Sequence, residues 1–413
     1  MRVAFLSVSD QMGGSEVMLL QIFAALGRSR PSWPLHVVVP GTGPLAERAA
    51  AAGAHVVAVP MPASLATLGD WGAGRGSAAL ALRLLRAAVD LPAYEGRLRE
   101  VLSAIGPDVL HTNGFKAHIV GARARRSCGG LVWHVHEYVG SRPMTRRLLR
   151  LYARRAGIIV ANSESVAADV RRVAGEHADV RVVYNAVDLD RFSPAGAAVD
   201  LDARCGLDPA PAGTVRVGLV ATFSRWKGHE TFLRALAALP PAAPIRGYVI
   251  GGALYDTDGS QHAATELRAL AASLGLDGRV GFTGFVDSVD GVMRALDVVV
   301  HASTLPEPFG LVIAEAMACG RAVITTATGG AAELVRDGVD AVTHRPGEPL
   351  DLAARIEWLA ADASLRARLG HAARETAARR FDATRLAGQF AAIYEAARAS
   401  APVVHGARGE RRV

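Results

Sequence analysis

The sequence predicts an α/β protein with two doubly wound, Rossmann-like domains that face each other across a cleft. Three observations lead to this prediction. The 413 residues exceed what one ordinary core needs. Short apolar runs alternate with helical patterns in both halves of the chain. A single stretch rich in Pro, Gly, Ala and Asp interrupts this alternation near the middle.

In the first half, helical patterns separate the candidate strands, and the clearest of them lie at 15–26 and near 45–52. This order is typical of a parallel sheet with crossover helices. The candidate strands of the first half lie at 3–8, 35–40, 55–60, 108–112, 131–135, 157–162 and 180–185.

The interruption covers 185–214, and the alternation restarts after it. We therefore expect an N-terminal domain over 1–190 and a C-terminal domain over 191–381. A last helix at about 382–400 is expected to pack back on the first domain. The candidate strands of the second half lie at 215–223, 246–252, 279–286, 297–303, 321–327 and 340–346.

Composition narrows the class of protein and of partner. Half of the residues are hydrophobic, and the net charge of +7 favours an anionic partner. The basic residues lack interleaved aromatics, and aromatic content is only 6%, which argues against nucleic acid. Cys128, Cys205 and Cys319 are far apart and suit a reducing compartment. The start of the chain reads as a strand and no run of about 18 apolar residues occurs, so we expect a soluble, cytoplasmic protein.

Ligands of such sheets bind beyond the carboxyl ends of the strands, and two loops there suit an anion. Gly13 and Gly14 allow close backbone approach, and Ser15 can cap the helix that follows. An ordinary strand-to-helix turn is the alternative. Arg225 and Lys227 stand together at the start of a helix, where cations oppose the helix dipole unless an anion lies between them. The alternative is a pair of solvated surface cations.

Two acids flank the mouth of a further expected helix, which starts at about Leu311. Glu307 precedes it and Glu315 lies one turn inside it, with seven residues between them. Ionised carboxylates accept hydrogen bonds from vicinal diols, so both could face the hydroxyls of a ligand. Alternatively, Glu315 pairs with a nearby arginine and Glu307 is an exposed loop acid.

A strand end in the first half carries His134, His136 and Glu137. Alternation places the two histidines on one side of the strand. The chain offers no further ligands at a suitable spacing for zinc. A catalytic or sugar-binding histidine is the favoured interpretation for one of them, and a structural histidine for the other.

Together, these cations, amides and carboxylates describe a site for a sugar linked to a diphosphate. The sequence also resembles a known family. "EPFGLVIAE" at 307–315 is similar to the E-x7-E signature of the retaining glycosyltransferases of family 4, which have the GT-B fold. The order of "GGSE", "RWKGHE", "VVYNAVD", "TGFV" and "ATGGAAELV" agrees with it from Val3 to about Phe381. One departure is that Thr222 and Phe223 stand where many relatives have Gly-Arg.

The resemblance implies roles for the site residues. Arg225 and Lys227 resemble the pair that grips the donor diphosphate, and Glu315 the acid that binds ribose. Glu307 resembles the acid beside the donor sugar, and His136 a histidine that contacts this sugar. The backbone contacts implied for sugar, phosphate and base involve Phe309, Gly310, Leu311, Phe285, Val286, Gly13 and Gly14.

The family implies a nucleotide-diphosphate sugar held by the second domain, with UDP expected before GDP, and an acceptor side in the first. It implies a front-face, retaining transfer to a glycan or lipid-linked acceptor, with no bound metal and no cofactor. The alternatives are a sugar-nucleotide epimerase of the same fold and an inactive nucleotide-sugar-binding module. The segment Arg142–Arg155 has six arginines and no acid, so it suits an anionic membrane surface as a basic amphipathic helix. A packing helix with a solvated arginine face is the alternative.

Overall fold

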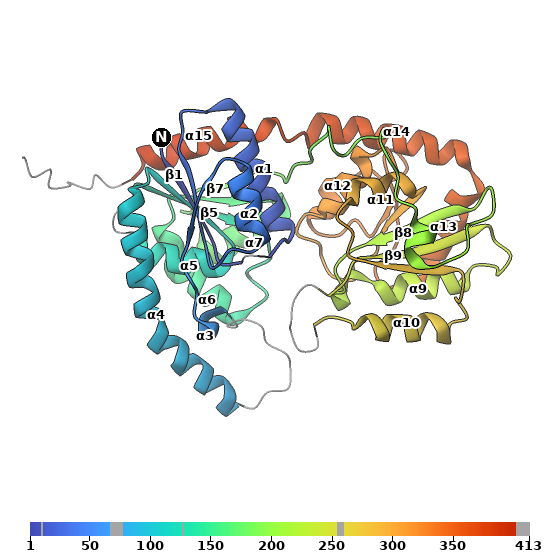
Figure 1. Ribbon diagram of the computed structural model, residues 1–413, viewed down its shortest axis with the longest axis horizontal. Helices are drawn as coiled ribbons and strands as arrows, with labels where there is room; N and C mark the ends of the chain where they lie inside the picture. Colours follow the sequence, from blue (N-terminus) through green and yellow to red (C-terminus); the bar gives the residue numbers. More distant parts are fainter. Residues whose placement is uncertain (10, 67–76, 126–127, 254–259, 402–413) are drawn as a thin grey trace, which may run out of the picture. The chain divides into compact units, whose positions relative to one another are not determined.

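The computed structural model describes residues 1–9, 11–66, 77–125, 128–253 and 260–401. The chain divides into two compact units (Figure 1). Unit 1 contains the described residues of 1–68, 76–183 and 384–413, and unit 2 those of 184–383.

Unit 1 is built on a parallel sheet of seven strands in the order β3-β2-β1-β4-β5-β6-β7. The chain crosses over between β1 and β4, so the sheet is doubly wound as the sequence predicts. The central strands are buried along their whole length, which explains their continuous apolar runs. The strands are β1 (Val3–Ser7), β2 (Leu35–Val39), β3 (His55–Ala58), β4 (Val109–Asn113), β5 (Gly130–Val135), β6 (Ile158–Ala161) and β7 (Val180–Val182).

Helices cover both faces of this sheet. The last helix, α15, packs against α1 and β5. Unit 1 therefore combines segments from both ends of the described chain. Its helices are α1 (Gly14–Ser29), α2 (Pro44–Ala51), α3 (Ala63–Ala66), α4 (Ser77–Ile105), α5 (Phe115–Ala124), α6 (Pro143–Tyr152), the 3-10 turn η2 (Ala153–Arg155), α7 (Glu164–Ala174) and α15 (Arg385–Ala399).

Unit 2 repeats this architecture with six parallel strands in the order β10-β9-β8-β11-β12-β13. Its crossover lies between β8 and β11, the counterpart of the crossover in unit 1. Each strand predicted for the second half is found. The strands are β8 (Val215–Val220), β9 (Ile245–Ile250), β10 (Val280–Gly284), β11 (Val298–His301), β12 (Ala322–Thr325) and β13 (Val342–Thr343).

The helices of unit 2 lie on both faces of its sheet (Figure 1). A short helix, α8, forms inside the stretch that the sequence marks as a connection. The helices and 3-10 turns are α8 (Leu201–Cys205), η3 (Arg225–Lys227), α9 (His229–Ala238), α10 (Ala264–Ser273), α11 (Val289–Ala295), α12 (Leu311–Ala318), η4 (Gly330–Glu333), α13 (Pro349–Ala361) and α14 (Ala363–Arg380).

Candidate functional site

In unit 2 the predicted site residues come from the carboxyl ends of neighbouring strands. Arg225 and Lys227 follow β8, Glu307 follows β11, and the loop 326–330 follows β12. These three strands are adjacent in the sheet. Since a crossover in strand order opens a crevice beyond the carboxyl ends, the topology itself gathers these residues.

The sequence predicts that Arg225 and Lys227 lie in the first turn of a helix. In the structure they lie just before the helix. They form the 3-10 turn η3, and Gly228 separates this turn from α9. Gly228 has a positive φ of 78°, and a Cβ there would lie 1.9 Å from the carbonyl oxygen of Ala302. Only glycine lets this turn approach the segment after β11 so closely. The close approach brings Lys227 to Glu307, which lies in that segment.

Lys227 and Glu307 form an ion pair. The Lys227 Nζ donates to Glu307 Oε2 at 2.7 Å and lies 4.0 Å from the centre of the Trp226 ring. Glu307 is only 6% exposed, so the alternative of an exposed loop acid is wrong. Its Oε2 also lies 3.0 Å from both His301 Nε2 and Ser303 Oγ.

The carboxylate of Glu307 is ionised despite its burial. Burial alone would raise its pKa, but the Lys227 ammonium and the hydrogen bond from His301 outweigh it. The pKa of Glu307 is therefore held well below its usual range. A buried, ionised acid with fixed donors is well suited to stabilise positive charge on a ligand.

Arg225 is held by a different acid. Its Nη1 and Nη2 donate to the two carboxylate oxygens of Glu266 at 3.0 and 3.1 Å. The ring of His262 contacts both side chains, with Nδ1 3.3 Å from Arg225 Nη1 and 3.0 Å from Glu266 Oε1. Together with Glu230 these side chains could hold a metal ion, but the guanidinium of Arg225 already occupies the carboxylate. We therefore interpret the group as a support for Arg225.

The helix α12 begins after its N-cap, Gly310, whose positive φ of 90° favours glycine at this position. Phe309 is buried and its ring packs beside Tyr184 and Phe381, which fixes the approach to the helix. Leu311 is the first helical residue, as the sequence predicts. The backbone at this mouth is thus rigidly placed.

Glu315 lies one turn inside α12 and is half-buried. No hydrogen bond or ion pair is found for its carboxyl group within the described parts of the chain, so the expected alternative of an arginine partner is not seen. Burial raises the pKa of Glu315 to about 8, with Arg191 opposing the rise and Asp290 adding to it. The side chain is therefore available for a ligand.

Phe285 and Val286 follow β10, at the far edge of the sheet from β12. The Phe285 ring is 54% exposed, and its carbonyl oxygen accepts a hydrogen bond from Arg204 at 2.8 Å. An exposed ring beside ordered main chain suits a flat ligand such as a nucleobase.

In unit 1 the predicted residues meet at the carboxyl ends of β1, β4 and β5. The Gly13 N–H donates to Glu16 Oε2 at 3.2 Å, and Asn113 Nδ2 donates to Glu16 Oε1 at 3.4 Å. The Asn113 Oδ1 in turn lies 2.8 Å from His136 Nε2. One chain of hydrogen bonds thus joins the Gly13–Gly14 turn to His136.

The structure corrects the predicted cap of α1. Gly13, not Ser15, is the N-cap, and Ser15 Oγ instead donates to Glu16 at 2.8 Å. Glu16 completes a capping box with the backbone of Gly13. A Cβ at Gly14 would meet no atom within 4 Å, so there is open space beside this backbone.

The structure shows that the two histidines, His134 and His136, differ in burial. His134 is fully buried, and its ring lies against His111, His136 and Phe390. His136 is only half-buried, and burial lowers its pKa to about 3. The ring of His136 is therefore a neutral group at the edge of the core, whereas His134 belongs to the core.

Five polar residues of these clusters escaped the sequence analysis: Glu16, Asn113, Glu266, His301 and Ser303. Glu16 and Asn113 contact each other, and Glu266 contacts Arg225, across long distances in the sequence, whereas His301 and Ser303 lie six and four residues before Glu307. The signal that could have found three of them is position, because Asn113, His301 and Ser303 stand at or just after the ends of central strands.

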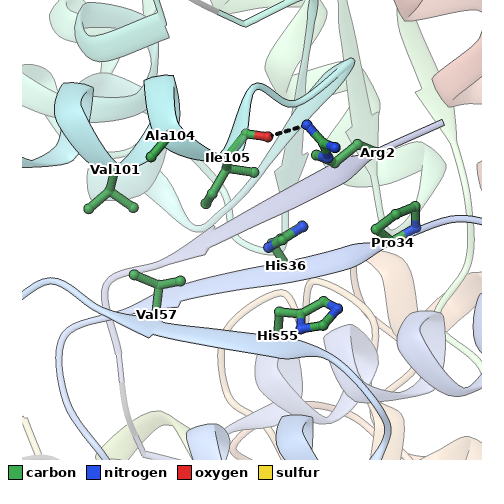
Figure 2. A pocket seen from close by; sticks show the side chains of 8 residues that line it. All are labelled: Arg2, Pro34, His36, His55, Val57, Val101, Ala104 and Ile105. Carbon is green, nitrogen blue, oxygen red and sulfur yellow. Dashed lines mark hydrogen bonds between the residues drawn. The ribbon is translucent and has the colours of Figure 1, made fainter.

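A hollow of about 500 Å³ lies elsewhere, at the amino ends of the strands in unit 1. Figure 2 shows His36 and His55 on neighbouring strands, and Val101 and Ala104 of α4 also line the hollow. The guanidinium of Arg2 is directed to the carbonyl oxygen of Ile105 at 2.6 Å. This end of the sheet is opposite to the one that carries the predicted site residues.

The basic segment forms α6 and η2, with Leu149 and Tyr152 buried and its arginines exposed. Two apolar side chains, Met144 and Leu151, are 51% and 67% exposed among these arginines. None of the helices in the described ranges is long and apolar enough to cross a membrane.

Comparison with known families gives two matches. The profile described as Glycosyltransferase Family 4 matches residues 12–191, and that described as Glycosyl transferases group 1 matches residues 210–376. The two matches lie in the two halves of the chain and together cover most of it.

Curated relatives include a lipopolysaccharide core biosynthesis glycosyltransferase, LpsE, of Rhizobium meliloti. It is 33% identical over 58% of this chain and 62% of its own length. The D-inositol 3-phosphate glycosyltransferase of Xylanimonas cellulosilytica is 36% identical over 57% of this chain and 56% of its own. The matched region thus spans about three fifths or less of these relatives.

Among solved structures, Anabaena HepE in complex with UDP-glucose superposes with a TM-score of 0.77. It is 28% identical and covers 96% of this chain and 99% of its own. A complex of the same Anabaena protein with UDP and glucose agrees equally well.

Proposed function

The chain belongs to the glycosyltransferases of family 4, and we propose that it transfers a sugar from a nucleotide-diphosphate sugar to a glycan or lipid-linked acceptor. The observation that carries this proposal is the convergence of Lys227 and Glu307 beyond β8 and β11. An ammonium and a buried carboxylate in contact offer one group for the diphosphate and one for the sugar.

Unit 2 is proposed to hold the donor. Lys227 and Arg225 bind the diphosphate, and the backbone at Phe309, Gly310 and Leu311 contacts sugar and phosphate. Glu315 accepts hydrogen bonds from the ribose hydroxyls. The main chain of Phe285 and Val286 holds the base. UDP is the proposed nucleotide, because the similar Anabaena structures contain UDP or UDP-glucose.

The mechanism follows from where charge develops. Breaking the anomeric bond leaves negative charge on the diphosphate, and preorganised cations stabilise this charge most in the transition state. The buried carboxylate of Glu307 stabilises the positive charge that develops on the sugar ring. The leaving phosphate accepts the proton of the acceptor hydroxyl on the same face, so the configuration is retained without an enzymatic nucleophile.

Unit 1 is proposed to contribute neutral contacts. The Gly13–Gly14 turn offers backbone close to open space, and His136 is the histidine proposed to contact the transferred sugar. A neutral imidazole and an amide network suit hydroxyl groups, because they bind without a charge to desolvate.

Calorimetric titration with UDP, GDP and ADP in the presence of a chelator tests the proposal. We expect UDP to bind and Lys227→Ala to weaken it about 10- to 100-fold. Lys116 and Lys227 are the two lysines of the sequence, so Lys116→Ala is a matched control that should bind UDP as the wild type does. If none of the three nucleotides binds, the proposal is wrong.

Turnover separates transfer from its rivals. Lys227→Ala should lower turnover more than it weakens sugar recognition, because the lysine acts on the leaving group. An epimerase would convert the sugar of the bound nucleotide without releasing UDP, and an inactive binding module would bind the donor and leave it unchanged. Chromatography of the reaction products distinguishes a transferase, an epimerase and an inactive binding module, because only the transferase releases UDP from the donor.

We also propose that α6 brings the protein to an anionic membrane surface, where a lipid-linked acceptor would lie. The support is the exposure of Met144 and Leu151 among arginines, since apolar side chains with flanking cations bind interfaces. Leu151→Glu should lower cosedimentation with vesicles of phosphatidylglycerol and phosphatidylcholine. Equal binding of the wild type to pure phosphatidylcholine vesicles would contradict the role of the arginines.

A further inference from the structure

The carboxylate of Glu307 has two immobile donors besides Lys227. His301 ends β11 and is 4% exposed, and Ser303 follows it and is fully buried. Both lie 3.0 Å from the same oxygen that accepts from Lys227. The oxygen is therefore surrounded by one flexible donor and two rigid ones.

The other nitrogen of His301 is also held. Its Nδ1 lies 3.0 Å from the hydroxyl oxygen of Thr325, at the end of β12. The same hydroxyl oxygen accepts the N–H of Ala327 at 3.2 Å. These contacts link Glu307 through His301 to the loop that follows β12.

The contacts assign the proton on the ring. An ionised carboxylate can only accept, so His301 Nε2 must carry a hydrogen to bond Glu307. The hydroxyl group of Thr325, which can donate or accept, contacts Nδ1, and its oxygen keeps a lone pair for the N–H of Ala327. Every donor meets an acceptor in this arrangement.

The loop after β12 also binds the backbone of Glu307. The Glu307 N–H donates to the carbonyl oxygen of Thr328 at 3.2 Å, and Gly330 N–H donates to the Glu307 carbonyl oxygen at 2.7 Å. Ala327 has a positive φ of 45°, which is rare for a residue with a side chain. One loop thus fixes Glu307 through its main chain and, by way of Thr325 and His301, through its carboxylate.

We propose that His301 is a positioning residue, which keeps Glu307 ionised and in place when Lys227 turns from it to the diphosphate of the donor. This inference rests on the proposed function, in which Lys227 binds that diphosphate. A long, flexible lysine can exchange partners, whereas a buried ring held at both nitrogens cannot. Without His301, the acid would keep Ser303 but lose one of its two rigid partners at the moment when its flexible one leaves.

Three variants and one control test the proposal. His301→Leu removes both ring contacts, His301→Gln keeps an N–H donor for Glu307, and Thr325→Val removes the hydroxyl group that contacts Nδ1. His118→Leu is the matched control, because His118 is also buried (1% exposed) and its ring contacts the hydroxyl group of Thr112 in unit 1 instead of Glu307.

The first measurement is UDP release from UDP-glucose in water, together with calorimetric binding of UDP. We expect His301→Leu to lower kcat at least about 10-fold, with KM and the Kd for UDP within about twofold of the wild type. His301→Gln should recover most of the lost kcat, and His118→Leu should behave as the wild type. A kcat of His301→Leu within twofold of the wild type overturns the inference, and so does a folded His301→Gln as slow as His301→Leu.

The second measurement needs no turnover. In protein labelled with 15N-histidine, the His301 signals, identified by their loss in His301→Gln, should show a proton on Nε2. This state should persist with saturating UDP and in Thr325→Val, because the carboxylate of Glu307 alone requires this proton. A wild-type ring without a proton on Nε2 overturns the inference even if UDP binds. If UDP, GDP and ADP all fail to bind, the proposed function fails and this inference fails with it.

Discussion

The two units use a histidine in opposite ways. In unit 1, His136 Nε2 faces the amide oxygen of Asn113 at 2.8 Å, and burial lowers the pKa of this histidine to about 3. In unit 2, His301 Nε2 faces the carboxylate of Glu307 at 3.0 Å, beside the ammonium of Lys227. The first cluster presents a neutral imidazole, and the second is an ion pair.

This difference suits the two tasks that we propose for the units. Both clusters lie at the carboxyl ends of parallel strands beside a crossover in strand order. An ion pair stabilises charge that changes during a reaction, whereas a neutral imidazole binds hydroxyl groups at a lower desolvation cost. We therefore expect changes in unit 2 to act on rate and changes in unit 1 to act on recognition.

The largest expected effect is that of Glu307→Gln. The change removes the negative charge opposite Lys227 and the developing sugar cation, so kcat for UDP release from UDP-glucose should fall about 100-fold or more. KM should change far less. A variant that keeps wild-type kcat would end the distinction between the two clusters.

A smaller effect is expected for Asn113→Leu in unit 1. The substitution leaves His136 Nε2 and Glu16 Oε1 without their present partner, at a cost of about 1–3 kcal/mol. We expect kcat/KM to fall about 10- to 100-fold, mainly through KM, in steady-state assays with UDP-glucose. A loss confined to kcat would show that unit 1 also acts on the chemical step.

A pH effect is expected at Glu315, whose pKa burial raises to about 8. The carboxyl group is mostly protonated at pH 7, and ribose hydroxyls donate better to the carboxylate, so UDP binding should release a proton. Affinity should therefore rise with pH between 6 and 8, by up to about tenfold per unit, and level off above 8.

Calorimetry in buffers of different ionisation enthalpy measures this proton release. Glu315→Gln binds the same nucleotide, so any titration of the phosphate is common to both proteins. We expect the variant to lack the extra proton and the extra pH dependence. Identical proton release by the wild type and the variant would show that the ribose does not bind at Glu315.

The smallest effect is on stability and concerns unit 1 alone. Burial raises the pKa of Tyr394 well above its usual range, so its hydroxyl group stays protonated and forms a hydrogen bond of 2.9 Å with His111 Nδ1. Tyr394→Phe should destabilise unit 1 by about 1 kcal/mol and leave unit 2 unaffected. Circular dichroism and tryptophan fluorescence during urea unfolding should show this shift in one transition; a shift in both would indicate that the units unfold together.

Much of the fold could be predicted because both sheets are parallel. Strands buried on both faces are continuous apolar runs, and each predicted run contains a strand. The loops with site residues followed from strand ends and from the resemblance to a family. The cap at Gly13 was missed because Ser15 is a favourable cap residue on local grounds, whereas the capping box with Glu16 selects the earlier position.

The partners of the site residues could not be predicted. Glu266 meets Arg225 from another helix, and Asn113 joins Glu16 to His136 across neighbouring strands. Such pairs depend on tertiary geometry and leave no spacing in the sequence. The contact of Lys227 with Glu307 is of the same kind, whereas His301 and Ser303 lie six and four residues before this acid.

The helix α15 has a consequence for the order of folding during synthesis. It supplies Phe390 and Tyr394 to the interior of unit 1, yet it is made after all of unit 2. A ribosome therefore exposes an incomplete unit 1 while the contiguous unit 2 is produced and can fold. We expect the apolar surface of α1 and β5 in the nascent first unit to stay uncovered until residues 385–399 emerge. This uncovered surface is where we expect chaperones to bind.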